Sequence, residues 1–174
     1  MACFPVTIQV KGKTTAIWRT LHWIATNENI PFKKMLWNKW FPNDYDGQEI
    51  VWIDEFNTWG NKFQRMDYIN HMLNLVSDGP STIEVKGGHV QCKAELVIFT
   101  GNLSSADMID QLGQTEMALA VRDRLMGSRS LMNYMLGSRR GQRNLIAELL
   151  HHIEHTFDLC FNVQIAVECI MSTL

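Results

Sequence analysis

Two short apolar runs, each ending in polar side chains, dominate the hydrophobic pattern of this chain. The first lies within 49–56 and ends on two adjacent carboxylates, Asp54 and Glu55, and the second lies within 95–100 and is followed by Asn102. Runs of about four to eight mostly apolar residues are typical of strands that are covered on both faces, as in a parallel sheet. We therefore expect two buried strands that bring Asp54 and Asn102 to the same edge of one sheet.

Helical periodicity marks four other segments, where apolar residues recur every three or four positions. These segments are 16–24, 62–76, 115–125 and 142–157. Between the two strands, the segment 82–93 alternates on both sides of a Lys-Gly-Gly sequence, which predicts a β-hairpin. Strands that alternate with helices predict an α/β domain. We expect a three-layer sandwich around a mostly parallel sheet, with the hairpin inserted.

The ends of the chain give weaker signals. A short strand is expected near 5–10, where apolar and polar residues alternate weakly. The segment 127–141 is rich in Gly, Ser and Arg, and its composition predicts a loop or a broken helix. We therefore expect one catalytic-type domain over 1–126, followed by a C-terminal helical extension over 127–174 whose role the sequence does not define.

Composition narrows the class of protein. With 174 residues, of which 46% are hydrophobic, the chain suffices for one domain with a substantial core. A charged fraction of 20% and a net charge of −2 argue against disorder, and also against nucleic-acid binding through overall charge. Four scattered cysteines without a signal peptide predict reduced thiols in an intracellular protein. The apolar stretch 157–171 contains Asp158 and Glu168 and is too short for a bilayer, so no membrane span is expected.

A candidate phosphate site precedes the first predicted helix, in the sequence Gly12-Lys13-Thr14-Thr15. A P-loop ends in this way: its backbone N–H groups surround phosphates, its Lys contacts them, and its Ser or Thr contacts Mg²⁺. The complete pattern has a glycine five positions before Gly12, where Thr7 stands. We predict that these four residues bind ATP and that Thr14 is a Mg²⁺ ligand. The missing glycine predicts weak or absent ATP hydrolysis, and a basic turn before a helix remains the alternative.

The order and spacing of the motifs resemble the superfamily 3 helicases of small viruses. The closest likeness is to the helicase part of the replication protein (Rep) of circular single-stranded DNA viruses, and it covers roughly residues 30–126. The sequences that carry it are Asn38-Lys39-Trp40, Tyr45-Asp46-Gly47-Gln48-Glu49, Asp54-Glu55, Glu84-Val85-Lys86-Gly87-Gly88 and Thr100-Gly101-Asn102. The resemblance implies a P-loop NTPase-like fold and an ATP-dependent helicase, here without the nicking domain of full-length Rep proteins.

The resemblance also implies roles for single residues. Asp54 would hold Mg²⁺, Glu55 would polarise the attacking water, and Asn102 would sense the γ-phosphate. Arg122 or Arg124 would reach the ATP of a neighbouring subunit and stabilise charge in the transition state. The structural alternatives are an acidic strand end, an Asn in a turn, and a helix face with ordinary ion pairs.

The predicted hairpin carries the candidate nucleic-acid site, at Lys86, Gly87 and Gly88. In helicases of this type the hairpin points into the pore of a hexameric ring, where its Lys contacts the nucleic-acid backbone. We therefore expect single-stranded DNA as the partner, with RNA as the alternative, and a homo-oligomer. Six copies of one Lys would form a charged collar, whereas a single Lys adds little affinity.

Two competing interpretations share this fold. One is the membrane-associated ATPase of positive-strand RNA viruses, which would place the protein in the host cytoplasm and not in the host nucleus expected for a Rep protein. The other is a non-catalytic remnant that keeps the fold as a binding module and has lost nucleotide binding, which the incomplete P-loop favours. Measured nucleotide binding separates the remnant from both enzymes.

Overall fold

The fold was determined as a computed structural model. It describes residues 2–7, 13–36, 45–54, 69–70, 73–75, 80–85, 87–101, 116–127, 132–133 and 138–174. In chain order the elements are β1 (Ala2–Thr7), α1 (Lys13–Asn27), β2 (Phe32–Leu36), β3 (Ile50–Asp54), β4 (Thr82–Val85), β5 (Gly88–Gln91), β6 (Leu96–Phe99), α4 (Glu116–Gly127), β7 (Met132–Asn133), α5 (Arg139–Thr156) and α6 (Val163–Ser172).

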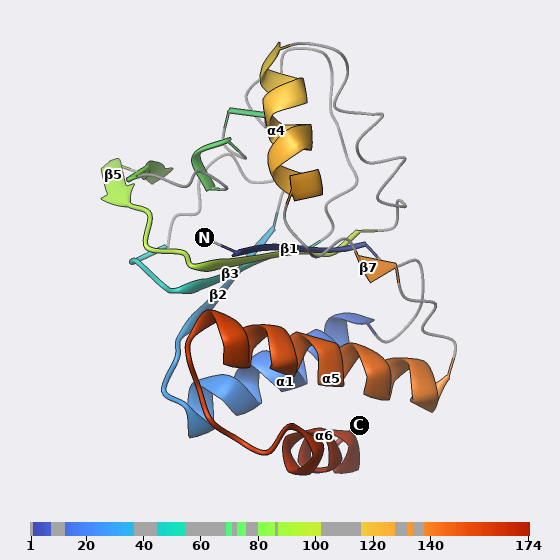
Figure 1. The fold of residues 1–174 in the computed structure, drawn as a ribbon. Coiled ribbons are helices and arrows are strands. Elements are labelled where there is room, and N and C mark those ends of the chain that lie inside the picture. The colour runs from blue at the N-terminus through green and yellow to red at the C-terminus, as the bar shows by residue number, and fades with distance from the viewer. Residues whose placement is uncertain are drawn as a thin grey trace.

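Five parallel strands form the central sheet, in the order β2-β3-β6-β1-β7. Parallel neighbours need crossover connections, and here the crossovers carry helices to the two faces of the sheet. Helix α4 covers one face, and α1 and α5 cover the other, with α6 packed on α1 and α5 away from the sheet (Figure 1). The prediction of a P-loop NTPase-like three-layer α/β sandwich with a mostly parallel sheet is therefore confirmed.

The predicted hairpin is also present, as a separate two-stranded sheet between β3 and β6 in the chain. Strands β4 and β5 pair antiparallel, with Thr82 opposite Gln91 and Val85 opposite Gly88. Gly87 stands in the turn with φ of +93°, a conformation that glycine adopts without the steric cost that other residues meet. Both Gly87 and Gly88 are exposed, so the tip of the hairpin faces solvent.

Strands β3 and β6 lack polar alternation because both of their faces are buried. Ile50 and Trp52 belong to the hydrophobic cluster under α1, α5 and α6, whereas Val51 and Ile53 belong to the cluster on the α4 side. In the same way, β6 sends alternate residues to each side. All five residues of β3 are buried, which explains why the sequence shows one continuous apolar run there.

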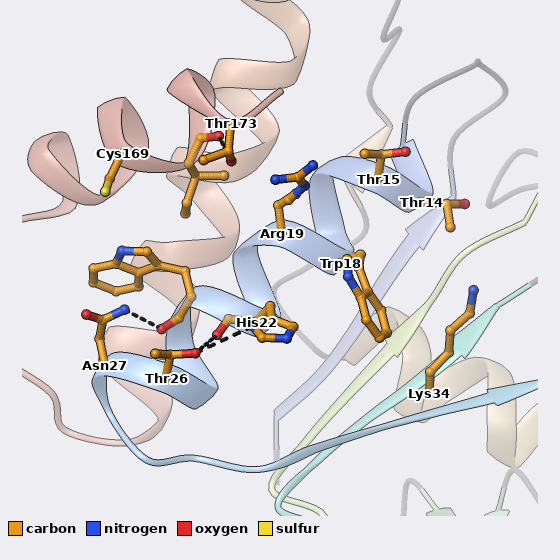
Figure 2. Close-up of a pocket in the computed structure, with 12 residues that line it drawn as sticks. Thr14, Thr15, Trp18, Arg19, His22, Thr26, Asn27, Lys34, Cys169 and Thr173 are labelled. Carbon is orange, nitrogen blue, oxygen red and sulfur yellow. Dashed lines mark hydrogen bonds between the residues drawn. The ribbon is translucent and has the colours of Figure 1, made fainter.

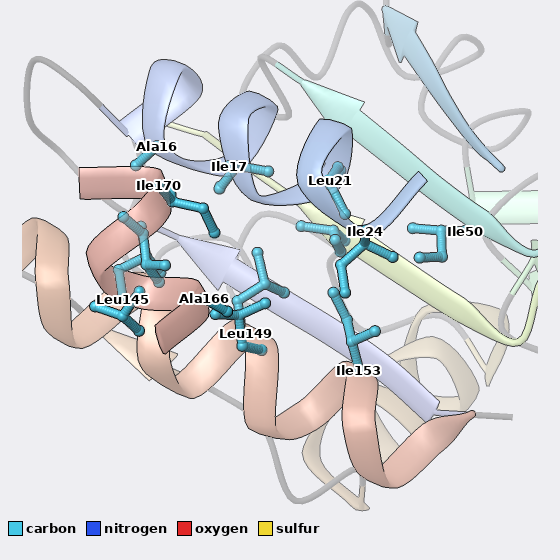
Figure 3. Packing of buried hydrophobic residues seen from close by; sticks show 14 of the residues in the cluster. Ala16, Ile17, Leu21, Ile24, Ile50, Leu145, Leu149, Ile153, Ala166 and Ile170 are labelled. Atoms are coloured by element: carbon cyan, nitrogen blue, oxygen red, sulfur yellow. The ribbon is translucent and has the colours of Figure 1, made fainter. Parts of the chain in front are cut away.

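The larger cluster joins the C-terminal helices to the sheet and to α1 (Figure 3). Its helical members include Ile17 and Leu21 of α1, Leu149 and Ile153 of α5, and Ile170 of α6, all of them buried. Burial of a Leu or Ile side chain contributes about 1.5–3 kcal/mol, so these contacts bind the helices into one core. Helices α5 and α6 therefore share one hydrophobic core with β3, the strand that ends in Asp54.

Capping residues set the starts of both C-terminal helices. The Ser138 side chain accepts a hydrogen bond from the Gly141 N–H at 3.2 Å, and Asn162 accepts one from the Ile165 N–H at 3.1 Å. Such caps satisfy N–H groups that have no partner within the helix. None of the helices that the structure describes is both long and apolar enough to span a membrane.

Three sequence expectations differ from the structure. The segment 127–141 holds the short strand β7, where a loop or broken helix was expected, and α5 begins at Arg139, three residues before the expected start. A two-residue strand has no detectable hydrophobic pattern, because its pairing with β1 alone defines it. The first strand covers Ala2–Thr7 and not 5–10. Most of the predicted helix 62–76 lies outside the described residues, although 69–70 and 73–75 are helical.

Candidate nucleotide-binding site

The carboxyl ends of β3 and β6 lie side by side, as the sequence predicted. Their register pairs Ile53 with Phe99, so Asp54 and Thr100 follow at the same edge of the sheet. The Thr100 hydroxyl donates a hydrogen bond to Asp54 Oδ1 at 2.6 Å and accepts one from Trp52 Nε1 at 2.9 Å. All three side chains are buried. The buried relay fixes the orientation of the Asp54 carboxylate, because each polar atom in it has a defined partner.

Lys13 comes to the same edge from the other direction. It is the first residue of α1, is 8% exposed, and donates a hydrogen bond from Nζ to the Gly101 carbonyl directly after Thr100. Thr14, half-buried, and Thr15, exposed, follow in the first turn of the helix. The amino end of a helix carries N–H groups without helical partners and a partial positive charge, both of which favour anions. Lys13 adds a full positive charge at this end.

Lys34 of β2 is a further cation at this edge that the sequence motifs did not identify. Its Nζ lies 2.7 Å from Asp54 Oδ2 and 4.4 Å from the centre of the Trp52 ring. The register of β2 and β3 pairs Lys34 with Trp52, which places Lys34 on the α1 side of the sheet. No strand was predicted at 32–36, and the contact of Lys34 with Asp54 depends on the pairing of β2 with β3, which no local pattern indicates.

A cavity of about 650 Å³ opens beside these residues along α1 (Figure 2). Thr14, Trp18, Arg19 and Lys34 are among the side chains that line it, and among the described residues no carboxylate lines it. The Trp18 ring is 43% exposed and packs edge-on against Phe32, with a centroid distance of 5.5 Å. Two cations and an exposed aromatic ring suit an anionic ligand that also carries a flat, apolar part.

The oxygen donors at the strand ends fit Mg²⁺ in their chemistry. Mg²⁺ prefers carboxylate and hydroxyl oxygens, and P-loop sites use one or two of these together with phosphate oxygens. Asp54 supplies a carboxylate, and Thr14 supplies a hydroxyl next to Lys13. Within the described part of the chain, no group of three or more His, Cys, Asp and Glu side chains offers a metal site independent of phosphate.

Several predicted site residues lie outside the described residues. These are Gly12, Glu55, Lys86 and Asn102, and for Arg124 only the backbone is described. The structure therefore brings together Lys13 and Asp54 of the predicted site. It adds Thr100, Gly101 and Lys34, to which sequence reasoning had assigned no role.

The remaining predicted residues belong to other surfaces. Arg122 of α4 has a 40% exposed side chain, and its Nη2 lies 3.3 Å from Oδ1 of its neighbour Asp123. The predicted contact of Arg122 with the ATP of a neighbouring subunit stays a prediction. Gly87 and Gly88 form the exposed hairpin turn, in a sheet separate from the one that carries Asp54.

Comparison with known proteins defines the class. Residues 9–103 match a family model described as RNA helicase, and because this is more than half of the 174 residues, the chain belongs to that family. The match supports a superfamily 3 helicase-like P-loop domain, as the motif order indicated. The matched segment includes Lys13, Lys34, Asp54 and Gly101. No curated protein matches the sequence.

Two solved structures of NtrX from Brucella abortus are similar in part, one of them in complex with ADP. Their TM-scores are 0.46 and 0.47, with 17% and 16% sequence identity, and they cover 88% and 90% of this chain. The chain spans only 36% and 37% of the NtrX chains. Scores at this level mark a partial likeness, and nothing about the site is taken from it.

Proposed function

We propose that the strand-end site binds ATP with Mg²⁺ and that hydrolysis drives movement along single-stranded DNA during viral replication. The observation that carries the proposal is the convergence of Lys13 with the buried Thr100–Asp54 pair at one edge of the sheet. A cation at a helix start beside a carboxylate at a strand end is the arrangement that P-loop ATPases use for a metal–nucleotide complex. Membership of the RNA helicase family supports an enzyme of this class.

The contacts of each residue indicate its role in nucleotide binding. When a nucleotide binds, Lys13 would exchange the Gly101 carbonyl for a phosphate oxygen, which is a stronger hydrogen-bond acceptor because it is charged. Asp54 and Thr14 hold the cation, while Thr100 and the sheet keep Asp54 in one orientation. Bound Mg²⁺ supplies neutralisation of the phosphate charge. Because the orientation of Asp54 is set before ligand binding, little reorganisation is needed when the nucleotide arrives.

Nucleotide binding is the first test. A fluorescent ATP analogue should bind the wild-type chain, and Lys13→Ala should weaken binding at least about tenfold, since one charged hydrogen bond is worth about 1.5–3 kcal/mol. Lys33→Ala is the matched control, because Lys33 pairs with Val51 and faces the α4 side of the sheet. Equal affinity in all three proteins would show that Lys13 does not contact the nucleotide. No binding at all in the wild type would favour the non-catalytic remnant.

Hydrolysis and the choice of polymer form the second test. We expect slow turnover, because Thr7 stands where a P-loop has glycine. Glu55→Gln should abolish this turnover and leave nucleotide binding intact. Stimulation by single-stranded DNA but not by RNA would support the DNA-virus assignment. The opposite preference would support the RNA alternative.

The hairpin is the proposed nucleic-acid contact. Lys86→Ala should weaken binding to single-stranded DNA and lower the slope of log K against log salt by roughly 0.7 for each phosphate that the variant no longer neutralises. The measurement needs the assembled ring that we propose, because the net charge of −2 gives a monomer little attraction for DNA. An unchanged slope in the assembled mutant would assign the hairpin a structural role only.

A further inference from the structure

Both oxygens of the Asp54 carboxylate are occupied by partners from the chain itself. Oδ1 accepts the Thr100 hydroxyl at 2.6 Å, and Oδ2 lies 2.7 Å from Lys34 Nζ. Asp54 is 5% exposed, so few water molecules compete with these contacts. The ammonium group of Lys34 therefore occupies the position next to Oδ2 where a metal cation bound to Asp54 would lie.

We propose that Lys34 is a built-in counterion that keeps divalent cations off Asp54 until a nucleotide phosphate offers Lys34 another partner. The inference rests on the proposed nucleotide site and adds a residue to it. It makes Lys34 a positioning residue that couples cation binding to nucleotide binding. Free Mg²⁺ is excluded, whereas Mg²⁺ that arrives with a nucleotide is accepted.

The position of Lys34 suits this exchange. Its Nζ lies over the Trp52 ring, while its side chain remains 30% exposed and lines the cavity that Thr14 and Thr15 also line. Lys34 thus lies between the carboxylate and the space next to the start of α1, where Lys13 and the helix end attract phosphate. A phosphate group there gives the ammonium group an anionic partner within the same site.

Charge balance explains the exclusion. Asp54 and Lys34 together are neutral, so the pair offers a free divalent cation no net attraction, and the ammonium group repels it at short range. Replacing Lys34 by a neutral residue removes the ammonium group from Oδ2 of a nearly buried carboxylate, which is unfavourable. That carboxylate then gains a large advantage from binding a cation. Lys34→Met keeps an unbranched side chain on the strand position paired with Trp52 and removes the ammonium group.

The experiment uses Mg²⁺ alone on the nucleotide-free chain, with ionic strength held constant. The thermal unfolding midpoint of the wild type should not respond to MgCl₂, whereas Lys34→Met should start lower and rise as MgCl₂ is added. The apparent Kd for Mg²⁺ should be at least about tenfold lower in the variant. Lys33→Met should behave like the wild type. The double variant Lys34→Met, Asp54→Asn should lose the Mg²⁺ response, because the carboxylate is gone.

A Lys34→Met protein that binds nucleotide but shows no greater affinity for Mg²⁺ than the wild type would overturn the inference. A wild type that binds Mg²⁺ as tightly without ADP as with it would do the same, and this comparison decides the matter even if Lys34→Met does not fold. Absence of nucleotide binding in the wild type is a different result. It would refute the proposed function. A rise of the unfolding midpoint with MgCl₂ that is seen only in Lys34→Met would still show that Lys34 prevents Mg²⁺ from binding Asp54.

Discussion

Replacing Thr100 by valine tests the buried relay at the centre of the site. Valine has nearly the same shape as threonine, so packing is preserved and only the hydroxyl is lost. Asp54 then loses a charged hydrogen bond, worth about 1.5–3 kcal/mol, and the buried Trp52 N–H loses its acceptor, at a cost of about 1–3 kcal/mol. We expect the free energy of unfolding to fall by about 3–5 kcal/mol. For a chain of this length, that lowers Tm by roughly 10 °C.

Urea unfolding followed by far-UV circular dichroism and by tryptophan fluorescence provides the assay. Thr100→Ser is the matched control: it keeps the hydroxyl, loses one methyl group, and should cost only about 1 kcal/mol. The denaturant slope should stay constant in both variants, because neither changes the surface exposed on unfolding. A Thr100→Val protein within about 1 kcal/mol of the wild type would show that the relay contributes little. Thr100 would then not be the residue that holds Asp54 in place.

Three further predictions concern packing, the hairpin turn and pH. Leu149→Ala should lower the free energy of unfolding by about 2–5 kcal/mol, with Trp52 fluorescence and helical signal lost in one transition; separate transitions would mean that the C-terminal helices fold apart from the sheet. Gly87→Ala should cost about 1 kcal/mol more than Gly88→Ala because only Gly87 has positive φ, and equal costs would contradict this. Burial raises the pKa of Tyr45 to about 12 from about 10 in the unfolded chain. Its contribution to stability should therefore be complete below pH 10 and disappear as the pH rises toward 12, a loss absent in Tyr45→Phe.

The sequence predicted those elements whose signal is local. Strands β3 and β6 were found because burial on both faces leaves unbroken apolar runs, and the polar residue that ends each run indicated the shared edge. The hairpin was found because a Gly-Gly pair between two alternating segments is typical of a tight turn. Helix α5 was found from the spacing of its apolar residues. Its packing against α1 was not, because a stripe of apolar residues does not indicate which element will cover it.

What the sequence did not predict depends on pairing between distant residues. Strand β7 exists through its register with β1, and nothing within Met132–Asn133 marks it as a strand. The role of Lys34 depends on β2 lying next to β3, which brings the lysine to Asp54 from about 20 positions away in the sequence. The role of Thr100 likewise required its two partners to be placed in space. The sequence motifs identified the sheet edge that carries Asp54, but they did not identify Lys34 and Thr100, the side chains that contact Asp54 there.

The position of β1 inside the sheet has a consequence for folding during synthesis. Ala2 pairs with Leu96, and Val6 pairs with Met132, so β1 leaves the ribosome well before either of its neighbours. At 5–20 residues per second, β1 waits on the order of ten seconds for β7 to be made. During that interval the backbone N–H and C=O groups on the edge of β1 that later pairs with β7 have no sheet partner. Strands with such an unpaired edge can pair wrongly with other chains. Slow closure of such distant contacts predicts that the nascent chain depends on chaperones until β6 and β7 have been made.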